Sequence, residues 1–125
     1  MNVPDQLFYT KDHEWVEFHQ DKIIIGITDY AQSQLGDIIF VEMPQAGDIF
    51  VAGNTFGEIE AVKTVSELYA PLSGTVIEVN DCIEKEPEFV NTDPYGKGWL
   101  IKLKCSNQLE NSSLLSSSEY EKLIS

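Results

Sequence analysis

Short runs of apolar and β-branched residues alternate with turn-forming residues along most of the chain. In residues 56–62, apolar and charged side chains alternate, which is the pattern of a strand with one buried face. Residues 99–104 show the same alternation, and Trp99, Ile101 and Leu103 are expected to face the core. Such runs predict strands at residues 22–27, 38–43, 56–62, 65–68, 75–79 and 99–104. Their spacing predicts an all-β barrel or sandwich.

Two segments carry the signals of short helices. Residues 29–35 are followed by Gly36, which predicts one helix with a glycine cap at its C-terminal end. Residues 116–124 predict a second helix, in which Ser118 and Glu121 have the spacing of a capping box. The protein is therefore expected to be mainly β with a helix in each half.

The length and composition fit one folded domain over residues 1–125. Of the 125 residues, 42% are hydrophobic and 23% are charged, which is the usual balance of a globular protein. The predicted strands place the core at about residues 9–104. Residues 106–125 contain seven serines and are expected to form a less ordered tail that ends in the second helix. The acidic residues 81–93 are expected to form a solvated loop.

The chain is strongly acidic. Eight lysines and no arginine stand against 21 acidic residues, so the formal net charge is −13. A nucleic-acid-binding protein needs a basic face, which this composition excludes; partners with basic or mixed surfaces are expected instead. The longest aliphatic run, residues 23–27, is too short to span a membrane, and residues 1–5 lack the pattern of a signal peptide. We therefore expect a cytoplasmic protein, or a processed form in the mitochondrial matrix.

The common motifs of metal-dependent and nucleophilic catalysis are missing from the sequence. Residues 13–19, HEWVEFH, begin like a zinc-binding helix, but His13 and His19 lack the spacing that puts two imidazoles on one helix face. No G-x-S-x-G, G-x-G-x-x-G or P-loop pattern occurs. We therefore expect neither a metal site nor catalytic residues, and we expect Trp15 to belong to the core.

A single lysine stands at the centre of the most informative segment, residues 57–67. One predicted strand runs up to Lys63 and another runs away from it, with acidic residues on both sides. Most lysines in such a position only add solubility. A carrier protein, however, needs a lysine of this kind, because acylation would give a neutral, swinging arm that moves an intermediate between separate active sites. Two similar turn-and-strand units, residues 35–41 and 72–79, flank the hairpin.

Several longer motifs identify a family that the chain resembles. They are HEWV at 13–16, GITDYAQ at 26–32, LGD at 35–37, VEMP at 41–44, APLSG at 70–74, VN at 79–80 and NTDPYGKGWL at 91–100. Together with residues 57–67, they resemble the H protein of the glycine cleavage system. The resemblance covers about residues 9–120, and the motifs occur in the order that the family has.

The resemblance implies a carrier protein rather than an enzyme. The family fold is a lipoyl-domain core, a flattened β-barrel or sandwich of two sheets (a barrel-sandwich hybrid) with added helices. Lys63 corresponds to the lysine that holds lipoic acid covalently, attached by a lipoate ligase or lipoyltransferase. The implied partners are the P protein (glycine decarboxylase), the T protein (aminomethyltransferase) and the L protein (dihydrolipoamide dehydrogenase). The arm would carry an aminomethyl group from P to T protein and electrons to L protein. We expect a monomeric carrier.

Further site residues also follow from the resemblance. Glu60 and Gly74 match positions that related lipoyl proteins use for recognition by the attaching enzyme. Gly74 also has a structural explanation, since a turn there would need a positive φ. Glu14 and Glu67 match acidic positions near the docked arm, where a carboxylate would hold a cationic amine. Gln34 stands where some relatives have a histidine near the arm.

Other functions stay open at this stage. A lipoyl relay would use the same Lys63 to donate lipoyl groups to subunits of 2-oxoacid dehydrogenases, without P or T protein. A biotin carrier would share the two similar units, but it would have methionines on both sides of the lysine, where this chain has Val62 and Thr64. An enzyme would need a nucleophile and a base that the sequence does not show. A structural module would leave Lys63 unmodified.

Overall fold

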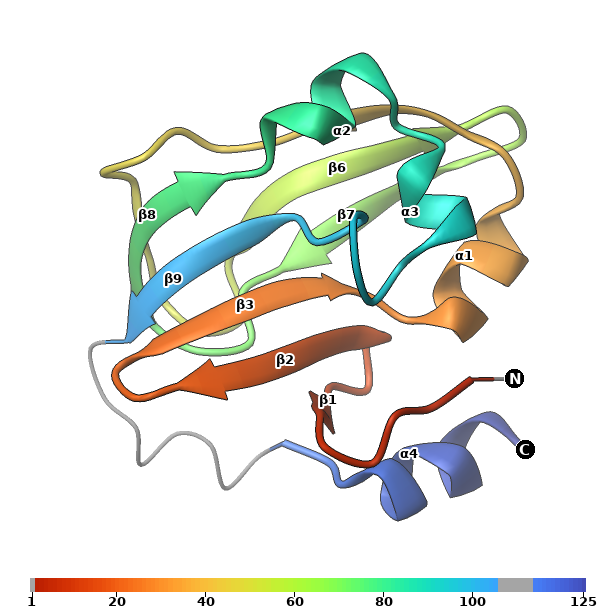
Figure 1. Cartoon of the computed structure of the whole chain (residues 1–125), viewed down its shortest axis with the longest axis horizontal. Coiled ribbons are helices and arrows are strands. Elements are labelled where there is room, and N and C mark those ends of the chain that lie inside the picture. Colours follow the sequence, from red (N-terminus) through yellow and green to blue (C-terminus); the bar gives the residue numbers. More distant parts are fainter. Residues whose placement is uncertain (1, 106–113) are drawn as a thin grey trace.

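The computed structural model describes residues 2–105 and 114–125, and Figure 1 shows their arrangement. Residues 106–113, which form the first part of the predicted serine-rich tail, lie outside the described residues. The described chain is mainly β, with four short helices, and the strands form two antiparallel sheets.

One sheet has six strands and the other has three. The six-stranded sheet has the order β1-β2-β3-β9-β8-β5, and the three-stranded sheet has the order β4-β6-β7. The strands of the larger sheet are β1 (Phe8–Tyr9), β2 (Glu14–His19), β3 (Lys22–Ile27), β9 (Ile101–Cys105), β8 (Gly74–Val79) and β5 (Ile49–Phe50). Those of the smaller sheet are β4 (Ile38–Glu42), β6 (Thr55–Ala61) and β7 (Val65–Tyr69).

The main core lies between the two sheets, as a mainly β fold of two sheets requires. Ile23 and Ile25 of β3 alternate with outward residues and are fully buried, and they share a cluster with Val41 of β4 and Ile59 of β6. Every predicted strand is present, with boundaries that differ by one or two residues. The described strands do not close into a barrel, because the outer strands of one sheet do not pair with those of the other.

Helix α1 (Asp29–Leu35) agrees with its prediction residue for residue. The Thr28 side chain caps its first turn by accepting a hydrogen bond from the Ala31 amide at 3.1 Å. Gly36 ends it with a φ of 79°, a conformation in which glycine has no steric penalty. In Figure 1, α1 lies at the same end of the molecule as the turn between β6 and β7.

The predicted loop at residues 81–93 is wrong. The structure has two short helices there, α2 (Asp81–Lys85) and α3 (Phe89–Thr92). Ile83 and Val90, which stand among the acidic residues, are fully buried, and their burial fixes the two turns against the core. Asn80 adds a cap, because its side chain accepts a hydrogen bond from the Cys82 amide.

The capping box of the last helix lies two residues before its predicted position. Helix α4 spans Ser117–Ile124, and its capping box is formed by Ser116 and Glu119. Leu115 still pairs with Tyr9 of β1, so the chain stays extended up to Ser116 and turns helical directly after it. The prediction failed because consecutive serines offer several equivalent caps, and the bridge between Leu115 and Tyr9 decides among them.

A second, aromatic cluster lies beneath α4. Leu7, Tyr9, Trp15 and Tyr120 are buried together there, which confirms that Trp15 belongs to the core. Trp99, which was also expected to belong to the core, is half-buried and packs against the edge of this cluster, and the Lys102 ammonium lies 5.0 Å from the centroid of its ring. Among the described residues, no helix is long and apolar enough to cross a membrane.

Candidate functional site

Lys63 occupies the tip of the hairpin formed by β6 and β7, as predicted. Glu60 pairs with Val65, and the Ala61 amide donates a hydrogen bond to the Thr64 carbonyl at 2.8 Å. The turn therefore consists of only Val62 and Lys63, and both are exposed. A two-residue turn is the tightest way to join antiparallel strands, so the lysine stands on a short, rigid support.

Backbone contacts fix the tip against the rest of the fold. The Val62 amide donates to the Asp37 carbonyl at 3.0 Å, in the segment between α1 and β4. The Asn91 side chain of α3 supports that segment, since it donates to the Gly36 carbonyl at 2.9 Å and accepts from the Ile38 amide at 3.0 Å. The position of the hairpin is thereby set by α1 and α3, while the Lys63 side chain remains exposed to solvent.

Glu60 lies on the outer face of the three-stranded sheet, three residues before Lys63. It is exposed and pairs with Phe40 of β4 on one side and Val65 of β7 on the other. The next row across the same sheet consists of Glu42, Glu58 and Glu67, one from each strand. Like charges in directly opposed positions repel one another, so this face presents an unusually negative potential beside the lysine.

Gly74 lies in the other sheet, as the first residue of β8. Its predicted positive φ is wrong, because the described glycines with positive φ are Gly36, Gly47 and Gly53. A glycine is needed for a different reason: an added Cβ would collide with the backbone carbonyl oxygen of Lys104 in β9. The close approach of two strands thus accounts for Gly74 without any contact with the Lys63 hairpin.

Glu14 is the most unusual charged residue near the hairpin. It begins β2, only 1% of its surface is exposed, and its carboxyl group reaches across to the other sheet. The Tyr69 amide of β7 donates to Oε2 at 2.7 Å, and the Thr10 hydroxyl donates to Oε1 at 3.2 Å. Burial raises the pKa of Glu14 from its ordinary value of 4.5 to about 8, against these hydrogen bonds, which lower it.

The raised pKa makes Glu14 a carboxyl group that responds to a nearby cation. Near neutral pH it largely holds a proton, because the charged form is poorly solvated inside the protein. A cation placed beside it would favour the charged form, lower its pKa and release the proton. The site is therefore suited to receiving a small positive group, whose charge the carboxylate would then balance.

Two depressions lie beside β7. One, of about 280 Å³, contains Glu14 and Tyr69 in its wall. The other, of about 310 Å³, contains Gln34 of α1 and Ser66 of β7. Asp12 lines both of them, so they are neighbours along the same strand.

Glu67 is exposed, and in the sequence it stands between Ser66 and Tyr69, which line the two depressions. The Tyr69 hydroxyl donates to its Oε2 at 2.9 Å, and this hydrogen bond raises the pKa of the Tyr69 phenol. Tyr69 thus contacts Glu67 through its side chain and Glu14 through its backbone. The structure thus links Glu14 and Glu67 through Tyr69, whereas Gln34 lines the neighbouring depression beside Ser66.

Sequence reasoning missed Asp12, His13, Ser66 and Tyr69. Tyr69 is recognisable only from the structure, because its contact with Glu14 uses a backbone amide that every residue except proline has. His13 lines the depression beside Gln34, although its motif had been considered only for metal binding. In the described part of the chain, no three His, Cys, Asp or Glu side chains come together as metal ligands.

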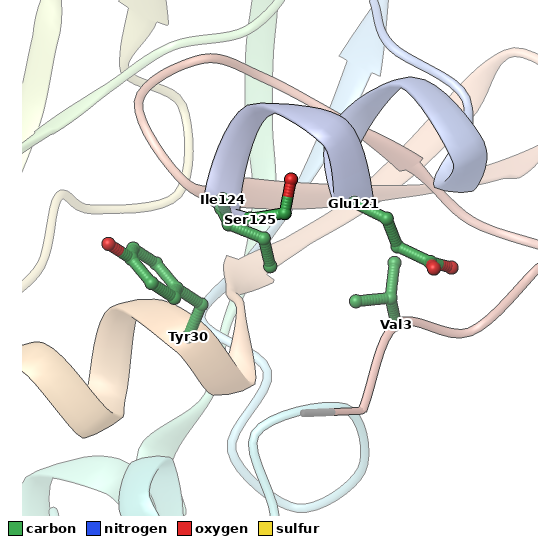
Figure 2. Close-up of a pocket in the computed structure, with 5 residues that line it drawn as sticks. All are labelled: Val3, Tyr30, Glu121, Ile124 and Ser125. Carbon is green, nitrogen blue, oxygen red and sulfur yellow. The ribbon is translucent and has the colours of Figure 1, made fainter.

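A third depression lies apart from Glu14 and Gln34, between α4, α1 and the N-terminal segment. Figure 2 shows Glu121 and Ile124 of α4, with Ser125 directly after the helix, opposite Val3 and Tyr30. Its volume is about 310 Å³, and Tyr30 also lines the depression that contains Gln34. Tyr30 therefore lies between the C-terminal helix and the depression that contains Gln34.

Comparison with known proteins identifies the family. The family model for the glycine cleavage H-protein matches residues 7–125. Glycine cleavage system H proteins from Geobacillus kaustophilus and Staphylococcus carnosus are 53% and 50% identical over 124 residues, which cover 99% of this chain and 98% of each relative. The crystal structure of a glycine cleavage system H protein from Mycobacterium marinum has a TM-score of 0.88 and 38% identity, and the match covers 96% of this chain and 97% of that one. The chain therefore belongs to the family of glycine cleavage H proteins, the lipoyl-bearing shuttles of the glycine cleavage system.

Proposed function

We propose that Lys63 holds a lipoyl group in amide linkage, and that residues 1–125 act as one monomeric carrier domain in the cytoplasm. The arm carries an aminomethyl group from the P protein to the T protein and electrons to the L protein. The observation that carries the proposal is the exposed Lys63 at the end of a two-residue turn that Asp37 holds in place. When bound, the lipoyl group supplies a disulfide that can be reduced and loaded.

The distances along β7 fit an arm attached at Lys63. About eleven bonds separate the Lys63 Cα from the ring of a lipoyl group, so an extended arm would reach on the order of 13 Å. A strand rises about 3.3 Å per residue, so this reach extends past Ser66 to the neighbourhood of Glu67. Gln34 and Asp12 line the same depression as Ser66. We place the docked arm there.

The ring and its aminomethyl group extend the loaded arm beyond Glu67 towards Glu14, which would act on the cargo. An aminomethyl amine is cationic, and beside Glu14 it would convert the buried, largely protonated carboxyl group into a carboxylate. The resulting charge pair would be sheltered from water, because Glu14 is almost completely buried. Glu14 and Glu67 would thereby retain the loaded arm between two partner enzymes, and the chain itself would perform no catalytic step.

Attachment of the lipoyl group would depend on the hairpin and its outer face. Glu60 is exposed and close in sequence to Lys63, so an attaching ligase or lipoyltransferase can contact both at once. For Gly74 we retain the proposed recognition role, in addition to the close strand packing that already requires a glycine there. The negative row of Glu42, Glu58 and Glu67 favours attaching and partner enzymes with basic surfaces.

The test is a reconstituted exchange assay with the P protein. The chain is treated with lipoate and a lipoate ligase, and the glycine-dependent exchange of labelled bicarbonate is then measured. We expect exchange with the wild-type protein and with Lys85→Arg, which changes an exposed lysine on α2, but none with Lys63→Arg. Exchange that persists in Lys63→Arg would contradict the proposal. Lipoylation without exchange, followed by transfer to a 2-oxoacid dehydrogenase subunit, would assign the relay function instead.

A further inference from the structure

The hydroxyl group of Tyr120 joins three distant parts of the chain. Tyr120 lies in α4, is completely buried, and stacks on Tyr9 with ring centroids 4.7 Å apart. Its hydroxyl oxygen lies 2.7 Å from the Thr28 hydroxyl and 2.9 Å from Nδ1 of His13. Packing against Tyr9 explains the aromatic ring, but the polar end makes contacts that a phenylalanine would lack.

The protons of this cluster have a consistent arrangement. Burial lowers the pKa of His13, which favours the neutral imidazole near pH 7. If the Tyr120 hydroxyl donates to Nδ1, the imidazole proton is on Nε2. The Thr28 hydroxyl can then donate to Tyr120 while it accepts the Ala31 amide at the start of α1. The hydroxyl protons of Thr28 and Tyr120 then each have an acceptor.

One partner of Tyr120 lines the depression that contains Gln34, and the other caps a helix that lines it. His13 lines it directly, and its ring centroid lies 5.0 Å from that of Tyr30, which also lines it. Thr28 caps α1, the helix that carries Tyr30 and Gln34. Figure 2 shows Tyr30 of α1 opposite Ile124 of α4. The C-terminal helix therefore supports two walls of the depression without lining it.

We infer that Tyr120 is a positioning residue for the docked arm: its hydroxyl holds the His13 ring and the first turn of α1, and so sets the shape of the depression beside Ser66. The inference rests on the proposed function, since it concerns the arm on Lys63. His13 has a φ of 68°, so its backbone is in an uncommon conformation, and the hydrogen bond with Tyr120 favours one orientation of its ring. Loss of the hydroxyl would loosen the depression and shorten the lifetime of the loaded arm.

The test compares Tyr120→Phe with the matched control Tyr9→Phe. Tyr9 is equally buried in the same cluster, and its hydroxyl donates to the Pro4 carbonyl at 2.6 Å instead of contacting His13. Each lipoylated protein is loaded with glycine and P protein and then separated, and the decay of the loaded mass is followed. We expect Tyr120→Phe to shorten the lifetime by roughly threefold to tenfold, the range for loss of one hydrogen bond, and Tyr9→Phe to leave it unchanged.

Nitrogen NMR of the His13 ring supplies a readout that a change in stability alone would not move. In the wild type and in Tyr9→Phe, the proton should be on Nε2, whereas Tyr120→Phe should give a mixture of both tautomers. A double-mutant cycle measures the coupling between Tyr120 and His13. His13→Asn, chosen because asparagine tolerates a positive φ, should remove most of the effect of Tyr120→Phe on lifetime.

The outcomes separate this inference from the proposed function. If no variant carries a lipoyl group on Lys63, the proposed function itself fails. If all are lipoylated and Tyr120→Phe decays at the same rate as Tyr9→Phe, only the positioning role is overturned. Equal His13 spectra in the two tyrosine variants, or additive effects in the double-mutant cycle, would also contradict it.

Discussion

The hairpin that carries Lys63 and the buried corner around Glu14 solve opposite problems within one site. At the hairpin, a charged side chain is exposed, and backbone hydrogen bonds together with the Asn91 side chain hold its support. At the corner, a carboxyl group is removed from water and held by the Tyr69 amide and the Thr10 hydroxyl. Attachment of an arm by another enzyme requires access, whereas retention of a reactive cargo requires exclusion of water. Lys63 and Glu14, which meet these two requirements, therefore lie at opposite ends of β7.

The largest expected effect is on carrier function when the hairpin lysine is replaced. Lys63→Ala should abolish lipoylation and all exchange activity, because no other lysine lies on the hairpin. The free energy of unfolding should change by no more than about 0.5 kcal/mol, since the side chain is exposed. Mass spectrometry and thermal unfolding measure the two quantities. A large loss of stability would show that Lys63 supports the fold and that the hairpin is not an independent support.

The next effect concerns the pH dependence of stability at the corner. Because folding raises the pKa of Glu14 from 4.5 to about 8, the folded protein holds this proton more tightly than the unfolded chain. Stability from this group is therefore fully present below about pH 4.5 and is lost as the pH rises towards 8. Glu14→Gln imitates the protonated form and lacks this loss.

Relative to Glu14→Gln, the wild type should lose on the order of 3 kcal/mol of unfolding free energy between pH 5 and pH 8. Urea unfolding at a series of pH values measures it, with Glu121→Gln on the exposed side of α4 as the control. If the unfolding free energies of the wild type and of Glu14→Gln change with pH in parallel, Glu14 is charged over this whole pH range. The buried carboxyl group would then behave like one on the surface.

A smaller effect is expected when the outer face of the hairpin loses a carboxylate. Glu60→Ala should slow lipoylation by a lipoate ligase about tenfold, equivalent to about 1.4 kcal/mol, while unfolding changes little because Glu60 is exposed. The initial rate of lipoyl incorporation is the measurement. Glu78→Ala, an exposed glutamate in the other sheet, is the matched control. Equal rates for Glu60→Ala and Glu78→Ala would remove the recognition role of Glu60.

The smallest effect concerns α4, the helix that supports the depression containing Gln34. Ser116→Ala removes the cap of α4 and should lower the unfolding free energy by about 1 kcal/mol, whereas Ser118→Ala, on the exposed side, should have almost no effect. Chemical unfolding of the two variants measures the difference. The reverse order would place the capping box at Ser118 and Glu121, the position that the sequence predicted.

The hairpin could be predicted from the sequence much better than the corner could. Alternation in residues 56–62 and the glycine cap of α1 are local signals, so both elements and the tip position of Lys63 follow from neighbouring residues. The turns around Ile83 and Val90 escaped prediction because burial against the core outweighs their acidic neighbours. The contact between Glu14 and Tyr69 joins residues 55 positions apart through a backbone amide, and residue identities alone do not specify such a contact.

The structure also shows which features of the motifs have a structural cause of their own. Gly74 had two explanations, and the carbonyl of Lys104 supplies a third that is sufficient to require glycine. Trp15 is fixed in the aromatic cluster, and its indole N–H donates to the Pro94 carbonyl at 2.9 Å. A family motif therefore combines residues that serve the arm with residues that build the support for it.

The mass of the protein purified from its own host tests the central claim most directly. Intact-mass measurement is followed by peptide sequencing across residues 57–67. The account predicts one lipoyl group, attached to Lys63 and to no other lysine. A lipoyl group on a different lysine, a biotin in its place, or an unmodified chain that a lipoate ligase cannot modify would contradict it.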